Sequence, residues 1–237
     1  MSKSILRAKM LSHTEQLVLK HLSQFVSEHK KAGVERVLSK RTKYITIILE
    51  DIFQSQNASA VIRTCECMGL QEVHIVENLT KYNINRRVLK GADRWMNLKR
   101  HNSRRGNNTE SCIKALKSEG YQILVADPDQ DAISIFDVDI QHAPIALLFG
   151  NELRGVSKEA LAHCDQKVTI PMSGFTESLN ISVSVAICLS TLVSWLNNSE
   201  IQFGLPSAEK EAIRLDWYRK IVRRSALIER EFVRTIE

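Results

Sequence analysis

The spacing of apolar residues changes near residue 44. Over residues 5–40 apolar positions recur at helical intervals, which predicts a helical segment with one apolar stripe. From Tyr44 to Leu49 the residues are apolar or β-branched almost without interruption, a pattern typical of a strand that is buried on both faces. The chain is therefore expected to pass from a helical N-terminal segment into the first strand of a sheet.

Strand-like and helix-like segments alternate after this first strand. The predicted strands cover 72–76, 121–126, 145–149 and 167–170, and the predicted helices cover 58–68, 109–118, 157–163 and 180–196. Asn57 is a candidate N-cap of the first of these helices. Such alternation favours an α/β fold in which helices flank a parallel sheet.

Both ends of the chain are predicted to be helical. Residues 206–236 form a charged amphipathic pattern that predicts one more helix. We therefore predict three regions: a basic helical N-terminal extension at 1–43, an α/β domain at 44–198 and a helical C-terminal extension at 199–237.

Positive charge is concentrated in two segments. The chain of 237 residues has a net charge of +6. Residues 1–43 hold ten Lys and Arg against three acidic residues, and residues 81–105 hold nine against Asp93 alone. Clustered Lys and Arg favour a polyanionic partner, because such side chains neutralise phosphate groups. Solvated helix faces and an exposed loop are the alternative interpretation.

Several functional classes lack support in the sequence. No apolar run approaches the roughly 20 residues that span a bilayer, and no signal-peptide pattern is present. The five cysteines lack a CxxC pair, which favours reduced thiols in a cytoplasm, and we expect no metal site, Cys65 and Cys67 included. Motifs for dinucleotide binding, phosphate-binding loops, zinc proteases and serine hydrolases are absent.

Three polar segments directly follow predicted strands, at 57–69, 148–155 and 170–186. In open parallel sheets, ligands bind at the carboxyl ends of the strands, so these segments are expected to form one site. The candidate polar side chains of this site are Asn57, Arg63, Glu152, Ser178 and Asn180. Taken singly, each also suits a helix cap, a backbone hydrogen bond or a surface ion pair.

The same segments resemble the three motifs of the SpoU/TrmH family of RNA 2′-O-ribose methyltransferases. The first is matched by Asn57 and, six residues on, Arg63. The second is matched by Phe149-Gly150-Asn151-Glu152-Leu153-Arg154-Gly155, and the third by Ile170-Pro171-Met172 with Ser178-Leu179-Asn180. Gly91-Ala92-Asp93-Arg94-Trp95 also resembles a family feature.

The resemblance implies a fold, a cofactor and an assembly. Family members have an α/β sheet whose C-terminal part is tied in a deep trefoil knot, the SPOUT type. They bind S-adenosylmethionine in that knot and act as homodimers. The cofactor contacts implied for this chain are at Ala126, Gly150, Asn151, Ile170, Met172 and Leu179.

The resemblance also implies catalytic roles. Arg63 is either the base that takes the proton of the ribose hydroxyl or a clamp on phosphate and developing alkoxide. The clamp is the preferred role, because a guanidinium is not readily deprotonated. Asn57 is expected to orient Arg63 or the ribose, and Glu152, Ser178 and Asn180 are expected to hold the shape of the site.

The implied function is that of a cytoplasmic, S-adenosylmethionine-dependent RNA 2′-O-methyltransferase acting on tRNA, at a guanosine of the D-loop. Neither a membrane nor DNA is an expected partner. The RNA-binding residues are predicted in the second basic segment: Arg86, Arg87, Lys90, Arg94, Arg104 and Arg105. A ribosomal RNA methyltransferase and a catalytically inactive RNA-binding protein of the same fold stay open as alternatives.

Overall fold

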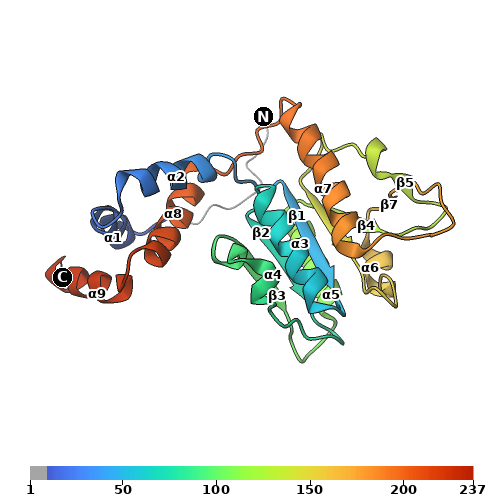
Figure 1. The fold of residues 1–237 in the computed structure, drawn as a ribbon, viewed down its shortest axis with the longest axis horizontal. Coiled ribbons are helices and arrows are strands. Elements are labelled where there is room, and N and C mark those ends of the chain that lie inside the picture. The colour runs from blue at the N-terminus through green and yellow to red at the C-terminus, as the bar shows by residue number, and fades with distance from the viewer. Residues whose placement is uncertain (1–9, 237) are drawn as a thin grey trace. The chain divides into compact units, whose positions relative to one another are not determined.

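The computed structural model describes residues 10–236, which divide into two compact units. One unit, Thr42–Phe203, contains the sheet. The other combines both ends of the chain, Met1–Arg41 and Gly204–Glu237, and consists mainly of helices where it is described. The elements of each unit are labelled in Figure 1.

The sheet within residues 10–236 has seven strands that pair in parallel, in the order β3-β2-β1-β6-β4-β7-β5. Every residue of the interior strand β1 is buried, as its nearly continuous apolar run predicts. The strands are β1 (Ile45–Glu50), β2 (Glu72–Val76), β3 (Asn97–His101), β4 (Gln122–Ala126), β5 (Ile133–Ser134), β6 (Ile145–Phe149) and β7 (Gln166–Thr169).

Helices cover both faces of the sheet. On one face α3 (Ser55–Cys67) packs against α7 (Ile181–Asn197), in front of the strands in Figure 1. On the other face α5 (Asn108–Ser118) packs against α6 (Lys158–His163). The shorter elements are α4 (Arg86–Leu89), η1 (Ala92–Arg94) and η2 (Ile135–Asp137). No helix within residues 10–236 has both the length and the apolar character to cross a bilayer.

The two ends of the chain fold together through helix packing and ion pairs. Their helices are α1 (His13–Ser23), α2 (Glu28–Leu38), α8 (Ser207–Ile221) and α9 (Ser225–Ile236). Helix α1 packs on α8 and α9, and α2 packs on α8. Arg214 donates two hydrogen bonds to Glu35, of 2.5 and 2.8 Å, and these bonds lower the pKa of Glu35 from its ordinary value.

The terminal segments differ from the sequence prediction in one respect. The helical segment predicted over 5–40 consists of two helices with a break between Ser23 and Glu28, and its first residues lie outside the described part of the chain. The C-terminal tail is also two helices, and Arg224 between them has a left-handed φ of 58°. Amphipathic spacing continues across both breaks, so it does not indicate them.

One prediction about the sheet unit is wrong, and one edge strand was not predicted. Helix α3 begins at Ser55 with Gln54 as its N-cap, so Asn57 lies within the first turn of the helix and does not cap it. The apolar pattern also misses β3, whose sequence Asn97-Leu98-Lys99-Arg100-His101 is largely polar. Strand β3 forms one edge of the sheet, where charged side chains and partial exposure are common.

Candidate active site

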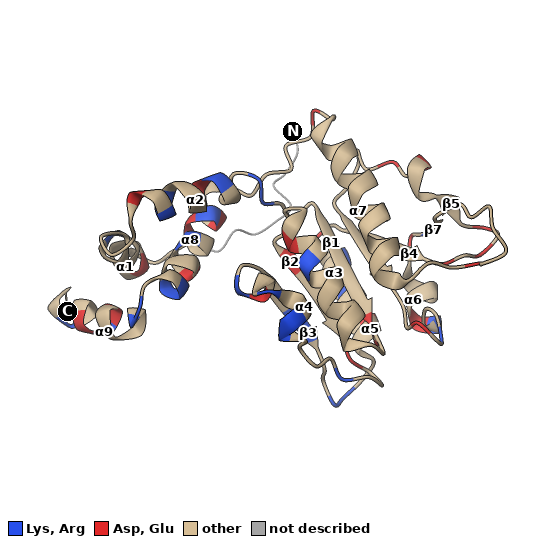
Figure 2. Cartoon of the chain, in the orientation of Figure 1, with Lys and Arg blue, Asp and Glu red and all other residues tan. Residues whose placement is uncertain are grey.

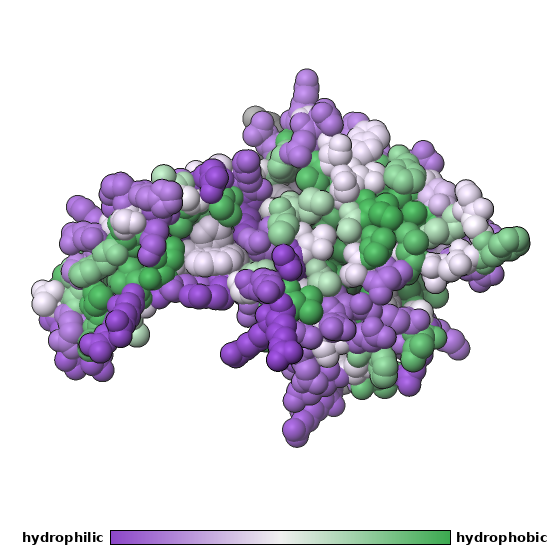
Figure 3. Space-filling view, in the orientation of Figure 1, coloured by the Kyte–Doolittle hydropathy of each residue, from purple (hydrophilic) through white to green (hydrophobic). Residues whose placement is uncertain are grey.

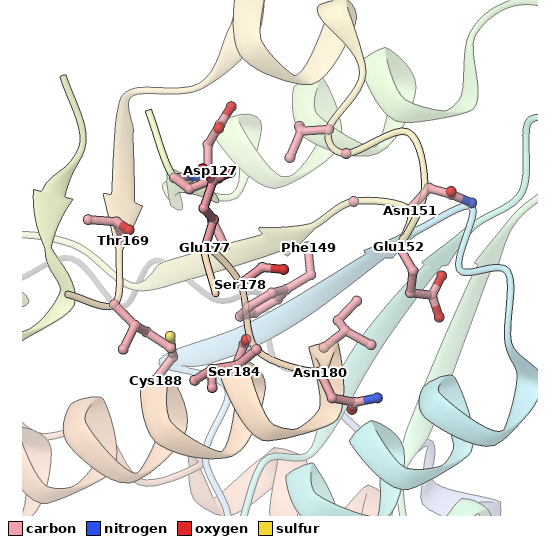
Figure 4. A pocket seen from close by; sticks show the side chains of 18 of the residues that line it. Asp127, Phe149, Asn151, Glu152, Thr169, Glu177, Ser178, Asn180, Ser184 and Cys188 are labelled. Carbon is pink, nitrogen blue, oxygen red and sulfur yellow. The ribbon is translucent and has the colours of Figure 1, made fainter. Parts of the chain in front are cut away.

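A cavity of about 390 Å³ lies at the carboxyl edge of the sheet (Figure 4). Its walls come from the ends of β4, β6 and β7, the loops that follow them, and the starts of α3 and α7. The strand ends lie side by side because Val125 of β4 pairs with Leu148 of β6 and Ala126 pairs with Val168 of β7. The polar segments therefore meet where open parallel sheets bind ligands.

The loop after β6 depends on two glycines. A Cβ atom at Gly150 would lie 2.3 Å from the carbonyl oxygen of Gly155, so only glycine fits at this close approach. Asn151 and Gly155 exchange two backbone hydrogen bonds, of 2.9 and 2.8 Å. The Asn151 side chain fastens the loop to β1, since its Nδ2 donates to the carbonyl oxygen of Asp51 at 2.6 Å.

Glu152 connects this loop to the start of α3. Its carboxylate accepts hydrogen bonds from the backbone N–H of Phe53 at 2.8 Å and of Gln54 at 3.3 Å, and from Nδ2 of Asn57 at 3.0 Å. The N-cap Gln54 makes no side-chain capping bond of its own. Glu152 therefore supplies the acceptor atoms and the negative charge that stabilise a helix N-terminus.

Asn180 extends this connection to α7. As the N-cap of α7 its Oδ1 accepts from the backbone N–H of Ser182 at 2.9 Å, the capping bond that the sequence suggests. Its Nδ2 donates to Oδ1 of Asn57 at 3.3 Å. A chain of hydrogen bonds thus runs from Glu152 through Asn57 to Asn180 and joins the three motif segments at one side of the cavity.

Arg63 is the one candidate catalytic residue outside the cavity wall. Six residues after Asn57, it is rotated by about 240° around α3 from that side chain. It is exposed and makes no hydrogen bond or ion pair within the described part of the chain. One turn earlier, Ser59 accepts a hydrogen bond of 3.1 Å from the N–H of Asn85, next to α4. Arg63 therefore projects from the α4 side of α3.

The residues expected to contact the cofactor all line the cavity, and so does the exposed side chain of Ser178. The six are Ala126, Gly150, Asn151, Ile170, Met172 and Leu179. The lining residues that the structure describes include three carboxylates and no Lys, Arg or His. The carboxylates belong to Asp127, Glu152 and Glu177, which are labelled in Figure 4. The cavity therefore favours a cationic or neutral ligand.

Sequence reasoning missed several lining residues. Asp127 and Thr169 lie at the ends of β4 and β7, so the rule that located the site could have found them. Ser184 and Cys188 lie on α7, and no local pattern distinguishes them from core positions. Burial raises the pKa of the Cys188 thiol to about 12, so this thiol stays protonated and is suited to packing rather than to nucleophilic attack.

The predicted RNA-binding side chains are all exposed. They come from α4, from the turn around Gly91 and from the loop after β3: Arg86, Arg87, Lys90, Arg94, Arg104 and Arg105. Basic residues appear on both α3 and α4 in Figure 2, and these two helices are in contact. Because Arg63 is the basic residue of α3, it belongs to the same positive surface.

Two other basic residues of this segment serve the structure instead. Lys99 pairs with the buried Glu72 at 2.7 Å, and Arg100 pairs with the buried Glu77 at 2.5 Å. Burial alone would raise the pKa of Glu77, but the hydrogen bonds from Arg100 and from the Tyr82 N–H lower it below its ordinary value. These two cations anchor β3 and are less available to a polyanion.

Comparison with known proteins gives consistent matches. A model of the SpoU rRNA methylase family matches residues 44–190. The chain is 44% identical to the tRNA (guanosine(18)-2′-O)-methyltransferase of Borreliella burgdorferi, over 88% of this chain and 93% of that protein. It is 30% identical to the Escherichia coli protein of the same name, over 77% of this chain and 79% of that protein.

The fold matches as well. The crystal structure of the A. aeolicus TrmH/SpoU tRNA modifying enzyme superposes with a TM-score of 0.72 and 26% identity, over 88% of this chain and all of that one. The parallel α/β sheet, the hydrogen-bonded polar loops at its carboxyl edge and the family match together define the class as an α/β RNA methylase. The chain belongs to the SpoU rRNA methylase family. The family resemblance and the flanked parallel sheet are thereby confirmed.

Proposed function

We propose that this protein transfers a methyl group from S-adenosylmethionine to the 2′-hydroxyl of a guanosine ribose in the D-loop of tRNA. The observation that carries the proposal is the hydrogen-bonded chain Glu152–Asn57–Asn180, which joins the three motif segments beside the cavity. The relatives at 44% and 30% identity carry the name tRNA (guanosine(18)-2′-O)-methyltransferase, which supports tRNA as the substrate and guanosine as the nucleotide.

The cavity suits S-adenosylmethionine in size and in charge. Its volume of about 390 Å³ is in the range of small-molecule sites. The carboxylates of Asp127, Glu152 and Glu177 complement a cofactor that carries a positive sulfonium, and Phe149 and Ile170 offer apolar surface. The bound cofactor supplies an electrophilic methyl group. The residues assigned to hold it are Ala126, Gly150, Asn151, Ile170, Met172 and Leu179.

Arg63 acts on the RNA in this proposal. Its exposed guanidinium lies on the positive side of α3, where it holds a phosphate group and stabilises the alkoxide that develops as the 2′-hydroxyl loses its proton. A guanidinium remains protonated near neutral pH, so the proton leaves to water or to a phosphate oxygen of the substrate. Arg63 is therefore an electrostatic clamp.

The remaining motif residues divide into positioning and contact roles. The Asn57 amide is occupied by Glu152 and Asn180, which supports a positioning role for Asn57 rather than direct orientation of Arg63. Glu152 fixes the start of α3, and Asn180 caps α7. Ser178 lines the cavity and its hydroxyl has no hydrogen-bond partner among residues 10–236, so it is the group available to meet the ribose.

The RNA backbone is held by the positive surface described above. Arg86 and Arg87 extend it from α4, Lys90 and Arg94 from the adjoining turn, and Arg104 and Arg105 from the loop after β3. Phosphate contacts of this kind position a nucleic acid and give most of the affinity without reading sequence. The groups that recognise the target guanosine are therefore expected near Arg63 and the cavity.

We also propose that this protein forms a homodimer, contains the knot of the family and is located in the cytoplasm. Exposed apolar side chains on α7 and the preceding loop, among them Leu179, Val183 and Trp195, support a homodimer. Figure 3 shows apolar surface over α7. The deep trefoil knot, in the segment that leads into α7, and a cytoplasmic location complete the proposal.

A second candidate substrate is ribosomal RNA, because the family model that matches the chain is described as an rRNA methylase. The test compares methyl transfer from labelled S-adenosylmethionine to unmodified tRNA and to ribosomal RNA. We expect label in tRNA, in a dinucleotide that resists alkali because its 2′-oxygen is blocked. Label only in ribosomal RNA would favour the second substrate. Binding of cofactor and RNA without transfer would favour an inactive RNA-binding protein.

A further inference from the structure

A cluster of two histidines and one cysteine lies on the face of the sheet that α5 covers. His74 comes from β2, His101 from the end of β3, and Cys112 from the buried side of α5. Because His74 pairs in register with Lys99, His101 lies two residues further along on the same face. The three residues are separated in sequence, so no spacing motif identifies them.

The ligand atoms of the cluster converge on one point. Nδ1 of His74 lies 3.0 Å from Nε2 of His101 and 3.7 Å from Sγ of Cys112, and all three atoms lie within 4.8 Å of one another. A tetrahedral zinc ion with ordinary bond lengths would separate two nitrogens by about 3.3 Å, and a nitrogen and a sulfur by about 3.6 Å. The two separations measured from Nδ1 of His74 are therefore within a few tenths of an ångström of those in a zinc site.

A contact with Glu72 orients the His74 ring, so that Nδ1 faces the cluster. Its Nε2 lies 3.0 Å from Oε1 of Glu72, and that carboxylate also pairs with Lys99 at 2.7 Å. An ionised carboxylate only accepts hydrogen bonds, so Nε2 of His74 donates to Glu72 and Nδ1 is the ring nitrogen that faces His101 and Cys112. A histidine that donates its outer N–H to a carboxylate is the usual arrangement behind a metal ligand.

The polar atoms of the three side chains face one another inside the fold. Nδ1 of His74 lies within hydrogen-bond reach of both Nε2 of His101 and Sγ of Cys112. Cys112 is fully buried, so its thiol has no access to water. A cation at this point would receive one lone pair each from His74, His101 and the Cys112 thiolate.

We propose that His74, His101 and Cys112 bind a zinc ion. Two imidazole nitrogens and a thiolate suit Zn²⁺, whereas Mg²⁺ and Ca²⁺ prefer oxygen ligands. The half-buried position of His101 leaves the fourth coordination position for water. Binding joins the edge strand β3 to β2 and α5, and it releases the thiol proton of Cys112 to solvent.

The zinc site is separate from the cavity, to which β2, β3 and α5 contribute no described lining residue. Its role is structural. It fixes the end of β3, directly before the loop that carries Arg104 and Arg105. Only this link to RNA binding rests on the proposed function, and zinc binding itself does not.

The test uses the full-length protein, stripped of metal by a chelator and titrated first with Co²⁺ and then with Zn²⁺. We expect one ion per chain, the visible absorption of tetrahedral cobalt, a thiolate-to-cobalt charge-transfer band, and a higher Tm with zinc. Cys112→Ser should remove the charge-transfer band. His101→Ala should weaken zinc affinity about 100-fold or more, and Glu72→Gln about 10- to 100-fold.

Matched controls use groups outside the cluster, the exposed Cys67 in Cys67→Ser and the exposed His142 in His142→Ala, which should leave binding unchanged. Far-UV circular dichroism of each metal-free variant checks folding. If Cys112→Ser does not fold, zinc competition with His101→Ala decides. Absence of stoichiometric binding by folded wild type, a charge-transfer band that survives Cys112→Ser, or wild-type zinc affinity in His101→Ala would each overturn the proposal.

Discussion

Nδ2 of Asn57 donates a hydrogen bond of 3.0 Å to Oε1 of Glu152, across 95 residues of sequence. The same carboxylate accepts two backbone hydrogen bonds at the start of α3, and Asn57 in turn accepts one from Asn180. One acidic side chain therefore connects the loop after β6 with α3 and, through Asn57, with α7. These contacts hold the three segments together at one side of the cavity.

Glu152→Gln should loosen this connection. Glutamine keeps one acceptor oxygen and replaces the other with a donor, so at least one of the N–H groups of Phe53, Gln54 and Asn57 loses its partner. We expect the free energy of unfolding to fall by about 1–3 kcal/mol and the methylation rate to fall with it. Urea denaturation and steady-state kinetics measure the two effects.

Glu159→Gln is the matched control, because Glu159 is an exposed acid in the first turn of α6. It should change stability by no more than about 0.5 kcal/mol. If Glu152→Gln is as stable and as active as the Glu159 control, Glu152 does not hold the site together.

Gly150→Ala should abolish cofactor binding. The new Cβ would lie 2.3 Å from the Gly155 carbonyl oxygen, and both sides of this contact are backbone, so the loop after β6 must move. Gly174→Ala is the control, because its Cβ would meet nothing closer than 3.9 Å. Calorimetric titration with S-adenosylmethionine should detect binding by the control alone. Equal affinity in both variants would show that the loop does not form part of the cofactor site.

Arg63→Ala should reduce the rate of methyl transfer by about 10²–10³-fold, the usual cost of removing one electrostatic contact to a developing oxyanion. Cofactor affinity should be unchanged, because Arg63 does not line the cavity. Arg63→Lys keeps the charge without the planar fork and should recover part of the rate with an unaltered pH profile. If the rise of the methylation rate with pH shifts to lower pH in Arg63→Lys, residue 63 instead acts as the base.

Replacing Arg86 and Arg87 together with glutamine should weaken tRNA binding and reduce its dependence on salt. Each lost phosphate contact lowers the slope of log K against log salt concentration by about 0.7–0.9. Lys158→Gln is the control, since Lys158 is exposed on α6, away from the basic segment. Filter binding over a salt series distinguishes the variants. An unchanged slope for the double variant would exclude α4 from the RNA interface.

The sequence predicts the inner strands of the sheet and the location of the site. The apolar runs of β1 and β6 predict buried strands, and the rule for carboxyl ends places Glu152 and Asn180 at one edge before any contact is known. It could not show that Glu152 caps α3, because that contact links residues distant in sequence. The sequence also could not show that the Arg63 and Asn57 side chains project from different sides of α3. Which side each residue occupies depends on the start of the helix at Ser55.

Strand β3 and the histidine–cysteine cluster could not be predicted because both depend on contacts between segments distant in sequence. Strand β3 forms an edge and satisfies its charges by pairing with the buried Glu72 and Glu77, so its sequence lacks an apolar run. The cluster of His74 and Cys112 depends on which face of the sheet α5 covers, and periodicity within one element does not determine that.

The most direct test of the central claim uses two tRNAs that differ by one oxygen atom. One is an unmodified tRNA, and the other has 2′-deoxyguanosine at position 18, the position that the names of the relatives specify. Wild-type protein and labelled S-adenosylmethionine should place one methyl group on the first tRNA and none on the second. Equal labelling of both, or of neither, would contradict transfer to the 2′-oxygen of that guanosine.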